Sequence, residues 1–156
     1  MQIQKIVSGG QTGVDRAALD AALAAGVDVG GWCPAGRRAE DGRIPDRYPL
    51  TETPSDEYAQ RTRWNVRDSD GTLILAPDPL EGGTALTRAA AEHQGQPVLH
   101  VRLSDTAPTS TIRDWGAGHD VHVLNVAGPR ASEVDDIYRV AREMLDDLLT
   151  AVSTSN

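Results

Sequence analysis

The amino-acid sequence predicts an α/β protein with a three-layer Rossmann-like fold, in which a mostly parallel sheet of about five or more strands carries helices on both faces. Short, apolar, β-branched segments alternate with longer segments whose apolar residues recur at helical spacing. Some strand-like segments are continuously apolar, as strands covered on both faces are. The 156 residues are a usual size for one domain. We assign residues 1–150 to that domain and residues 151–156 to a disordered C-terminal tail.

Glycine residues mark the ends of predicted elements in the first half of the chain. The apolar run at its start stops at a glycine turn, and an Ala-rich helical stripe follows until Gly26 ends it. After a second short strand, the chain carries Pro, Gly and Arg without a clear period. A connection of that length is often functional, and a surface insertion is the alternative. Acidic residues then open a helix. These elements are a strand at 3–7, a helix at 14–25, a strand at 27–31, a loop at 32–54 and a helix at 55–66.

The second half alternates strands and helices more clearly. A continuous apolar run closed by Pro77 predicts a strand buried on both faces. The last helix has apolar residues at helical spacing as far as Leu149, and Ser132 with Asp135 resembles a capping pair at its start. These elements are a strand at 72–76, a helix at 84–93, a strand at 97–103, a helix at 109–116, a strand at 121–126 and a helix from Ser132.

Composition excludes several classes of function. The net charge of −8 repels nucleic acid and anionic membrane surfaces. An anionic ligand must therefore be attracted by a local cluster of cations or by backbone N–H groups. The single cysteine, Cys33, excludes an intramolecular disulfide framework and a multi-cysteine metal site. We expect neither a signal peptide nor a membrane span, and we expect the protein to be cytoplasmic.

Three glycine-containing turns follow predicted strands and so share one edge of the sheet. Glycines let the backbone approach an anion closely, and a helix N-terminus offers free N–H groups to a phosphate. None of the turns matches the dinucleotide or phosphate-loop motif, and ordinary turns are the alternative. Their convergence favours a shared phosphate site. The candidates are Gly9, Gly10, Gln11, Thr12 and Gly13 in the first turn, Gly82, Gly83 and Thr84 in the second, and Asn125, Gly128 and Arg130 in the third.

Arginines gather in one stretch of the chain. Seven of the fourteen lie between residues 36 and 67. We prefer Arg37, Arg38 and Arg43 as ligand contacts, because guanidinium groups suit phosphate oxygens and planar heterocycles. Six acidic residues share the stretch, so a solvated surface of ion pairs is the alternative.

In the turn after residue 81, Thr84 is suited either to cap its helix or to donate to a phosphate oxygen.

A catalytic set is harder to find. Asp15 and Asp70 flank the predicted binding edge and could exchange a proton with a ligand, although each is equally suited to shape a turn. His119 and His122 lie at the edge of a predicted strand, whose alternating sides separate them. We therefore expect no metal site. We interpret Cys33 as a small buried thiol.

Several segments together resemble the molybdenum carrier family, over about residues 3–148. The resemblance implies a Rossmann-like fold in a circularly permuted branch of the lysine-decarboxylase-like (LOG-type) superfamily. It also implies oligomeric carriers of molybdenum cofactor, and it adds Arg16 to the candidate ligand contacts. The segments are Ser8-Gly9-Gly10-Gln11-Thr12-Gly13-Val14-Asp15-Arg16, Gly31-Trp32-Cys33-Pro34, Gly36-Arg37-Arg38-Ala39-Glu40-Asp41-Gly42, Tyr58 with Arg61-Thr62, Asn65-Val66, Asp68-Ser69-Asp70-Gly71-Thr72, Gly82-Gly83-Thr84 and Asn125-Val126-Ala127-Gly128-Pro129-Arg130.

Residues and resemblance lead to the same expectation. The protein binds molybdenum cofactor (molybdopterin) or a related phosphate-bearing pterin or nucleotide, as a carrier or storage protein and as a homo-oligomer, a dimer or a tetramer. One alternative is a phosphoribohydrolase-like enzyme that uses Asp15 or Asp70, and another is a nucleotide sensor. The corresponding segment 82–88 is shorter than the phosphoribohydrolase motif of that superfamily and lacks a Glu in the following turn. We therefore lean away from an enzyme and assign no catalytic residue.

Overall fold

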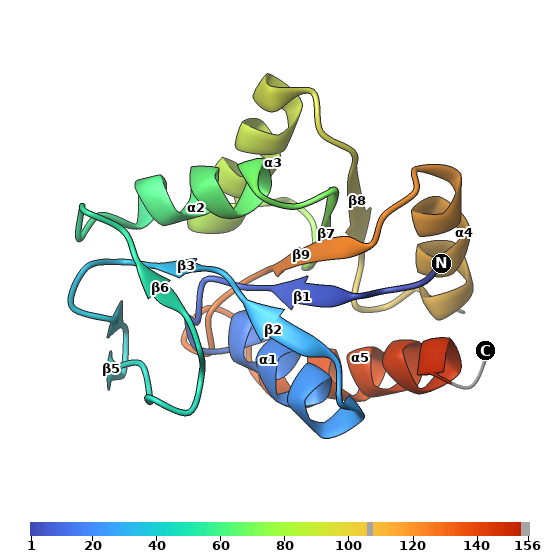
Figure 1. Cartoon of the computed structure of the whole chain (residues 1–156), viewed down its shortest axis with the longest axis horizontal. Coiled ribbons are helices and arrows are strands. Elements are labelled where there is room, and N and C mark those ends of the chain that lie inside the picture. The colour runs from blue at the N-terminus through green and yellow to red at the C-terminus, as the bar shows by residue number, and fades with distance from the viewer. Residues whose placement is uncertain (106–107, 154–156) are drawn as a thin grey trace.

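The computed structural model describes residues 1–105 and 108–153. Its centre is one five-stranded sheet in which every neighbouring pair of strands is parallel (Figure 1). The predicted α/β, Rossmann-like architecture is therefore confirmed. Across the sheet the strands are β2 (Asp28–Gly30), β1 (Lys5–Val7), β9 (Val123–Ala127), β7 (Gly71–Leu75) and β8 (Val98–Val101).

Helices cover both faces of the sheet (Figure 1). On one face α1 packs against α5, and its alanines let it approach the sheet closely in the main core. On the other face α2 packs against α3 around a smaller apolar cluster, while α4 contacts α5 and β8. The helices are α1 (Val14–Ala25), α2 (Tyr58–Arg67), α3 (Gly82–Gln94), α4 (Pro108–Gly118) and α5 (Ile137–Ser153). None of the helices within the described ranges has both the length and the apolar character needed to cross a membrane.

The segment 32–54, which was expected to be a loop, contains short strands and an apolar cluster. Four two-residue strands form one parallel and one antiparallel pair, and a second apolar cluster, with Ile44 and Tyr48 fully buried, packs against Leu19 of α1. Strands this short have no periodicity that a sequence could reveal. The strands are β3 (Trp32–Cys33), β4 (Arg38–Ala39), β5 (Gly42–Arg43) and β6 (Thr51–Glu52).

Several helix ends differ from their predicted positions. The capping pair of Ser132 and Asp135 is wrong, because α5 begins only at Ile137. The Ser132 hydroxyl instead donates to Glu40, 2.5 Å away. At its other end α5 continues to Ser153, past the expected domain boundary at 150, since no Gly or Pro interrupts it. The rest of the expected tail, residues 154–156, lies outside the described residues.

Candidate functional site

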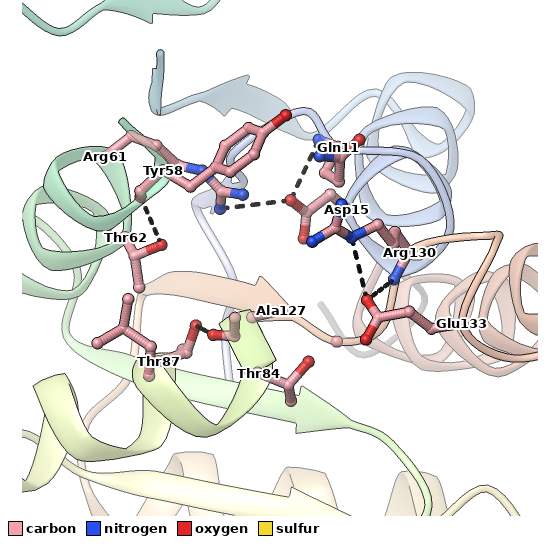
Figure 2. A pocket seen from close by; sticks show the side chains of 13 residues that line it. Gln11, Asp15, Tyr58, Arg61, Thr62, Thr84, Thr87, Ala127, Arg130 and Glu133 are labelled. Atoms are coloured by element: carbon pink, nitrogen blue, oxygen red, sulfur yellow. Dashed lines mark hydrogen bonds and ion pairs between the residues drawn. The ribbon is translucent and has the colours of Figure 1, made fainter. Parts of the chain in front are cut away.

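The carboxyl ends of the strands border a small pocket that is partly open to solvent (Figure 2). Its walls come from the turns after β1 and β9, from the start of α1 and from α2 and α3. This is the edge at which parallel α/β sheets bind their ligands. The lining residues are Gln11, Asp15, Tyr58, Arg61, Thr62, Gly83, Thr84, Leu86, Thr87, Ala127, Gly128, Arg130 and Glu133.

The N-terminus of α3 opens into this pocket. No side chain caps the helix. Within the described part of the chain, no protein acceptor is bonded to the N–H of Gly82 or Gly83. A Cβ placed on Gly83 would meet no atom within 4 Å, so space lies in front of these amides. The expected capping role of Thr84 is wrong, since α3 begins two residues earlier and Thr84 lies inside its first turn. Open amides and the helix dipole make this end suited to an anion.

The turn after β1 is closed, although its sequence resembles the turn before α3. The N–H of Gln11 donates to the Asp15 carboxylate at 3.2 Å, and the N–H of Val14 donates to the Pro129 carbonyl at 3.2 Å. Gly13 has a φ of 79°, and a Cβ there would lie 2.4 Å from that same carbonyl. These glycines therefore allow backbone packing against the turn after β9. The N–H groups of Gly10, Gln11, Thr12 and Val14 are bonded to the protein's own acceptors, which argues against a phosphate cradle built from these four amides.

Asp15 and Arg61 form an ion pair at the bottom of the pocket (Figure 2). Only 3% of Asp15 is exposed, and Arg61 Nη1 lies 3.6 Å from its Oδ2. Gly9 makes room for this arginine, because a Cβ there would lie 2.3 Å from Nη1. Burial raises the pKa of Asp15 to about 6, although Arg61 and the Gln11 N–H act to lower it. Arg61 Nε is buried without a hydrogen-bond partner among the described residues.

A second ion pair lies at the rim. Arg130 donates from both its backbone N–H and its Nε to Oε1 of Glu133, at 3.2 Å in each case (Figure 2). More than a third of each side chain is exposed, so a ligand can separate this pair more easily than the buried one. Glu133 Oε2 lies 3.9 Å from the position of a Cβ on Gly82. A carboxylate therefore lies beside the open end of α3. Gly128 lines the same rim and packs closely on the Leu75 carbonyl.

Tyr58 is surrounded by guanidinium groups from three separate segments. The guanidinium carbons of Arg38, Arg61 and Arg130 lie 4.5, 5.5 and 5.9 Å from the centroid of its ring. Of the three arginines predicted as ligand contacts in the 36–67 stretch, only Arg38 thus comes near the pocket. It is exposed and donates to the backbone carbonyl of Asp56 at 3.0 Å.

The other predicted arginines have structural partners. Arg37 is buried and donates to four backbone carbonyls of the 44–50 segment, so the prediction that it contacts a ligand is not supported. Arg43 pairs with Asp46 at 2.6 Å on the surface. Arg16 holds the carboxylate of Asp41 through both terminal nitrogens and bonds the Gly10 carbonyl at 3.1 Å. None of the three lines the pocket.

The remaining candidates lie beside the pocket or away from it. Asn125 is buried, donates to the Thr72 hydroxyl at 3.2 Å and lines a smaller adjoining cavity. The Thr12 hydroxyl contacts Glu40. Asp70 was expected at the binding edge, and this is wrong. It precedes β7, at the amino end of the strand, and accepts the N–H groups of His122 and Val123 at 3.0 and 2.8 Å.

Tyr58, Arg61 and Thr62 line the pocket and belong to the segments that carry the family resemblance, but the sequence analysis assigned them no ligand contact. Thr87 and Glu133 also line the pocket and were not predicted. A signal for three of them existed, because positions 58, 61 and 62 lie on one face of a helix. Within the described ranges, no group of three or more His, Cys, Asp or Glu side chains could hold a metal ion.

Comparisons with known proteins agree with the fold. A model of the Circularly permutated YpsA SLOG family matches residues 6–149. The chain is also similar to a crystal structure, at 1.45 Å resolution, of a "Putative molybdenum carrier protein" from Syntrophus aciditrophicus SB. The two sequences are 45% identical over 98% of this chain and 96% of that chain, with a TM-score of 0.90. Among curated proteins, none matches this chain.

Proposed function

The chain belongs to the circularly permutated YpsA SLOG family, and from that premise we propose that it binds a small phosphate-bearing ligand as a carrier or storage protein. The proposed ligand is the molybdenum cofactor or a related pterin or nucleotide. The observation that carries the proposal is the open N-terminus of α3, which faces two guanidinium groups across one pocket. The name of the similar crystal structure supports the carrier role.

In this proposal the phosphate binds in front of α3. The N–H groups of Gly82 and Gly83 and the hydroxyl of Thr84 donate to its oxygens, and Arg130 supplies charge from the rim. Every one of these groups is a donor, which is the chemistry that a phosphate requires. A molybdenum ion carried by such a pterin is held by the sulfur atoms of the pterin itself, so the proposal needs no protein ligand for the metal.

Native mass spectrometry with metal analysis tests the ligand. The full chain would be purified without oxygen from a host that makes the cofactor. A molybdopterin-sized adduct with stoichiometric molybdenum would establish a carrier, and a bound nucleotide without metal would establish the nucleotide form of the proposal. Protein with no phosphate-bearing adduct, and no affinity for added nucleotides, would overturn it. The same spectrum reports subunit number, for which we propose a dimer or a tetramer.

A pair of arginine variants tests the position of the site. Arg130→Ala should weaken phosphate-ligand binding at least about tenfold, because a charge-assisted contact is lost. Arg139→Ala is the matched control, since Arg139 lies on α5 and pairs with Asp136 and Glu143 outside the pocket. Equal affinities of the two variants would show that the ligand binds elsewhere. Calorimetric titration with a nucleoside monophosphate provides the measurement.

A second candidate, a nucleotide hydrolase, is favoured by one observation. Asp15 lines the pocket with a pKa of about 6, which suits a general acid near neutral pH. Asp70, at the opposite edge of the sheet, cannot share this role. Incubation of concentrated protein with a panel of nucleotides tests turnover. Release of base or phosphate that Asp15→Asn abolishes would establish this activity, and no release by the wild-type protein would exclude it for the panel.

A further inference from the structure

The mouth of the pocket differs chemically from its floor. The floor is polar, with Asp15 and Arg61 at the bottom and threonines of α2 and α3 around them. At the mouth, α2 contributes Tyr58 and α3 contributes Leu86. Leu86 is 36% exposed and belongs to a short series of large apolar side chains that face solvent in the described residues. An exposed leucine and a tyrosine in one pocket provide an apolar surface beside a site for an anion.

Tyr58 differs from the other tyrosines in what the fold requires of it. Tyr48 and Tyr138 both donate their hydroxyls to Asp20 at 2.6 Å, which links the 32–54 segment and α5 to α1. In the described part of the chain no hydrogen bond holds the Tyr58 hydroxyl, and its ring contacts guanidinium groups instead. Among the residues that line the pocket, as far as the structure describes them, Tyr58 is the aromatic one. The hydroxyls of two tyrosines therefore hold the fold together, whereas Tyr58 makes its contacts through its ring, inside the pocket.

We infer that the mouth of the pocket holds a planar heteroaromatic ring of the ligand, stacked on Tyr58 next to Leu86. The inference rests on the proposed function and adds to it the part of the site that selects a ring-bearing phosphate over a sugar phosphate. Aromatic side chains bind flat ring systems through stacking that tolerates differences in ring identity. Pterins, purines and pyrimidines all satisfy this requirement.

Arg38 lies over the Tyr58 ring, and in this inference the ligand ring takes its place. Its guanidinium lies 4.5 Å from the ring centroid. It is exposed, and it donates to the backbone carbonyl of Asp56 at 3.0 Å. A guanidinium is planar and stacks on aromatic faces, so this face of Tyr58 is already in contact with a flat group. The ring takes its place, and Arg38 then stacks on the outer side of the ring.

Calorimetric titration of the full chain with AMP, GMP and ribose 5-phosphate tests the inference. The first two carry a ring and the third has the same sugar phosphate without one. At least one of the nucleotides should bind about fivefold or more tightly than ribose 5-phosphate. Tyr58→Leu should remove this advantage and Tyr58→Phe should restore it. Tyr138→Leu, which changes a tyrosine outside the pocket, should keep the advantage.

The outcomes separate this inference from the proposed function. If ribose 5-phosphate binds and the rings add nothing, or if Tyr58→Leu keeps their advantage, the ring subsite is overturned and the phosphate site remains. If none of the three compounds binds to the wild-type protein and native mass spectrometry finds no phosphate-bearing adduct, the proposed function is overturned and the ring subsite with it. Thermal melting of each variant shows whether the chain is folded, and the phenylalanine variant tests the ring contact even where leucine disturbs the fold.

Discussion

Asp15 should make the protein less stable as the pH rises. Its pKa lies at about 6, against an ordinary value of 3.8, because burial opposes its charged form. A carboxyl with a raised pKa binds its proton more tightly in the folded state, so its favourable contribution is complete below the unfolded pKa. That contribution is lost as the pH rises through about 6. At about 1.36 kcal/mol per pH unit, the loss amounts to about 3 kcal/mol.

Asp15→Asn removes this dependence with little change in shape. The amide oxygen of asparagine can still accept the N–H of Gln11, which donates to Asp15 Oδ2 at 3.2 Å. The absolute stability of the variant depends also on Arg61, which loses its partner. The change with pH does not, since a guanidinium keeps its charge throughout this range. The free energy of unfolding of the variant, minus that of the wild type, should therefore rise by about 3 kcal/mol between about pH 3.5 and pH 7.

Urea denaturation of both proteins across this pH range measures the difference. Asp41→Asn is a contrasting control, because its hydrogen bond to Arg16 lowers the pKa of Asp41. A carboxyl of that kind stabilises the fold above its unfolded pKa, so the control difference should run in the opposite direction. A flat curve for Asp15→Asn would refute the reasoning. A falling curve would show that the attraction of Arg61, at 3.6 Å, outweighs burial.

Four further substitutions give distinct outcomes. Arg37→Ala should lower the free energy of unfolding by about 3 kcal/mol, because four backbone carbonyls lose a charged donor. Urea unfolding measures this change, and a loss below about 1 kcal/mol would contradict the prediction. Gly13→Ala should lower the free energy of unfolding by more than about 1 kcal/mol, because Gly13 has a φ of 79° and the Pro129 carbonyl lies close to it. Gly83 has open space around it, so Gly83→Ala should leave the melting temperature nearly unchanged. Glu133→Gln should bind orthophosphate about fivefold more tightly, since Glu133 competes for Arg130 in the free protein. Weaker binding by that variant in calorimetry would instead make Glu133 a ligand contact.

The layers of the fold follow from local pattern, and some boundaries do not. The apolar run at 72–76 identifies β7, because a strand buried on both faces needs continuous apolar residues. The start of α5 was missed because the Ser132 hydroxyl bonds to Glu40, which lies 92 positions away in the chain. The capping pattern was present at Ser132, and a distant carboxylate took the hydroxyl that the cap needed.

The choice among arginines also depends on distant contacts. Arg37 and Arg61 come from one arginine-rich stretch, and no periodicity distinguishes a structural arginine from one in a pocket. Arg37 is enclosed by a segment whose carbonyls converge on its guanidinium. Arg61 lies beside Gly9, where the missing Cβ admits it to the bottom of the pocket. Only the folded arrangement of these segments separates the two.

The glycine turns, in contrast, could have been separated from the sequence. Both precede a helix, but α1 carries Asp15 in its first turn and α3 has no acidic residue there. A carboxylate at that position can reach back to the turn and accept its free N–H groups, as Asp15 does for Gln11. An acid at this position therefore takes up an N–H of its own turn. The turn at Gly82 and Gly83 has no such acid within its helix, and its amides remain available to an anion from outside.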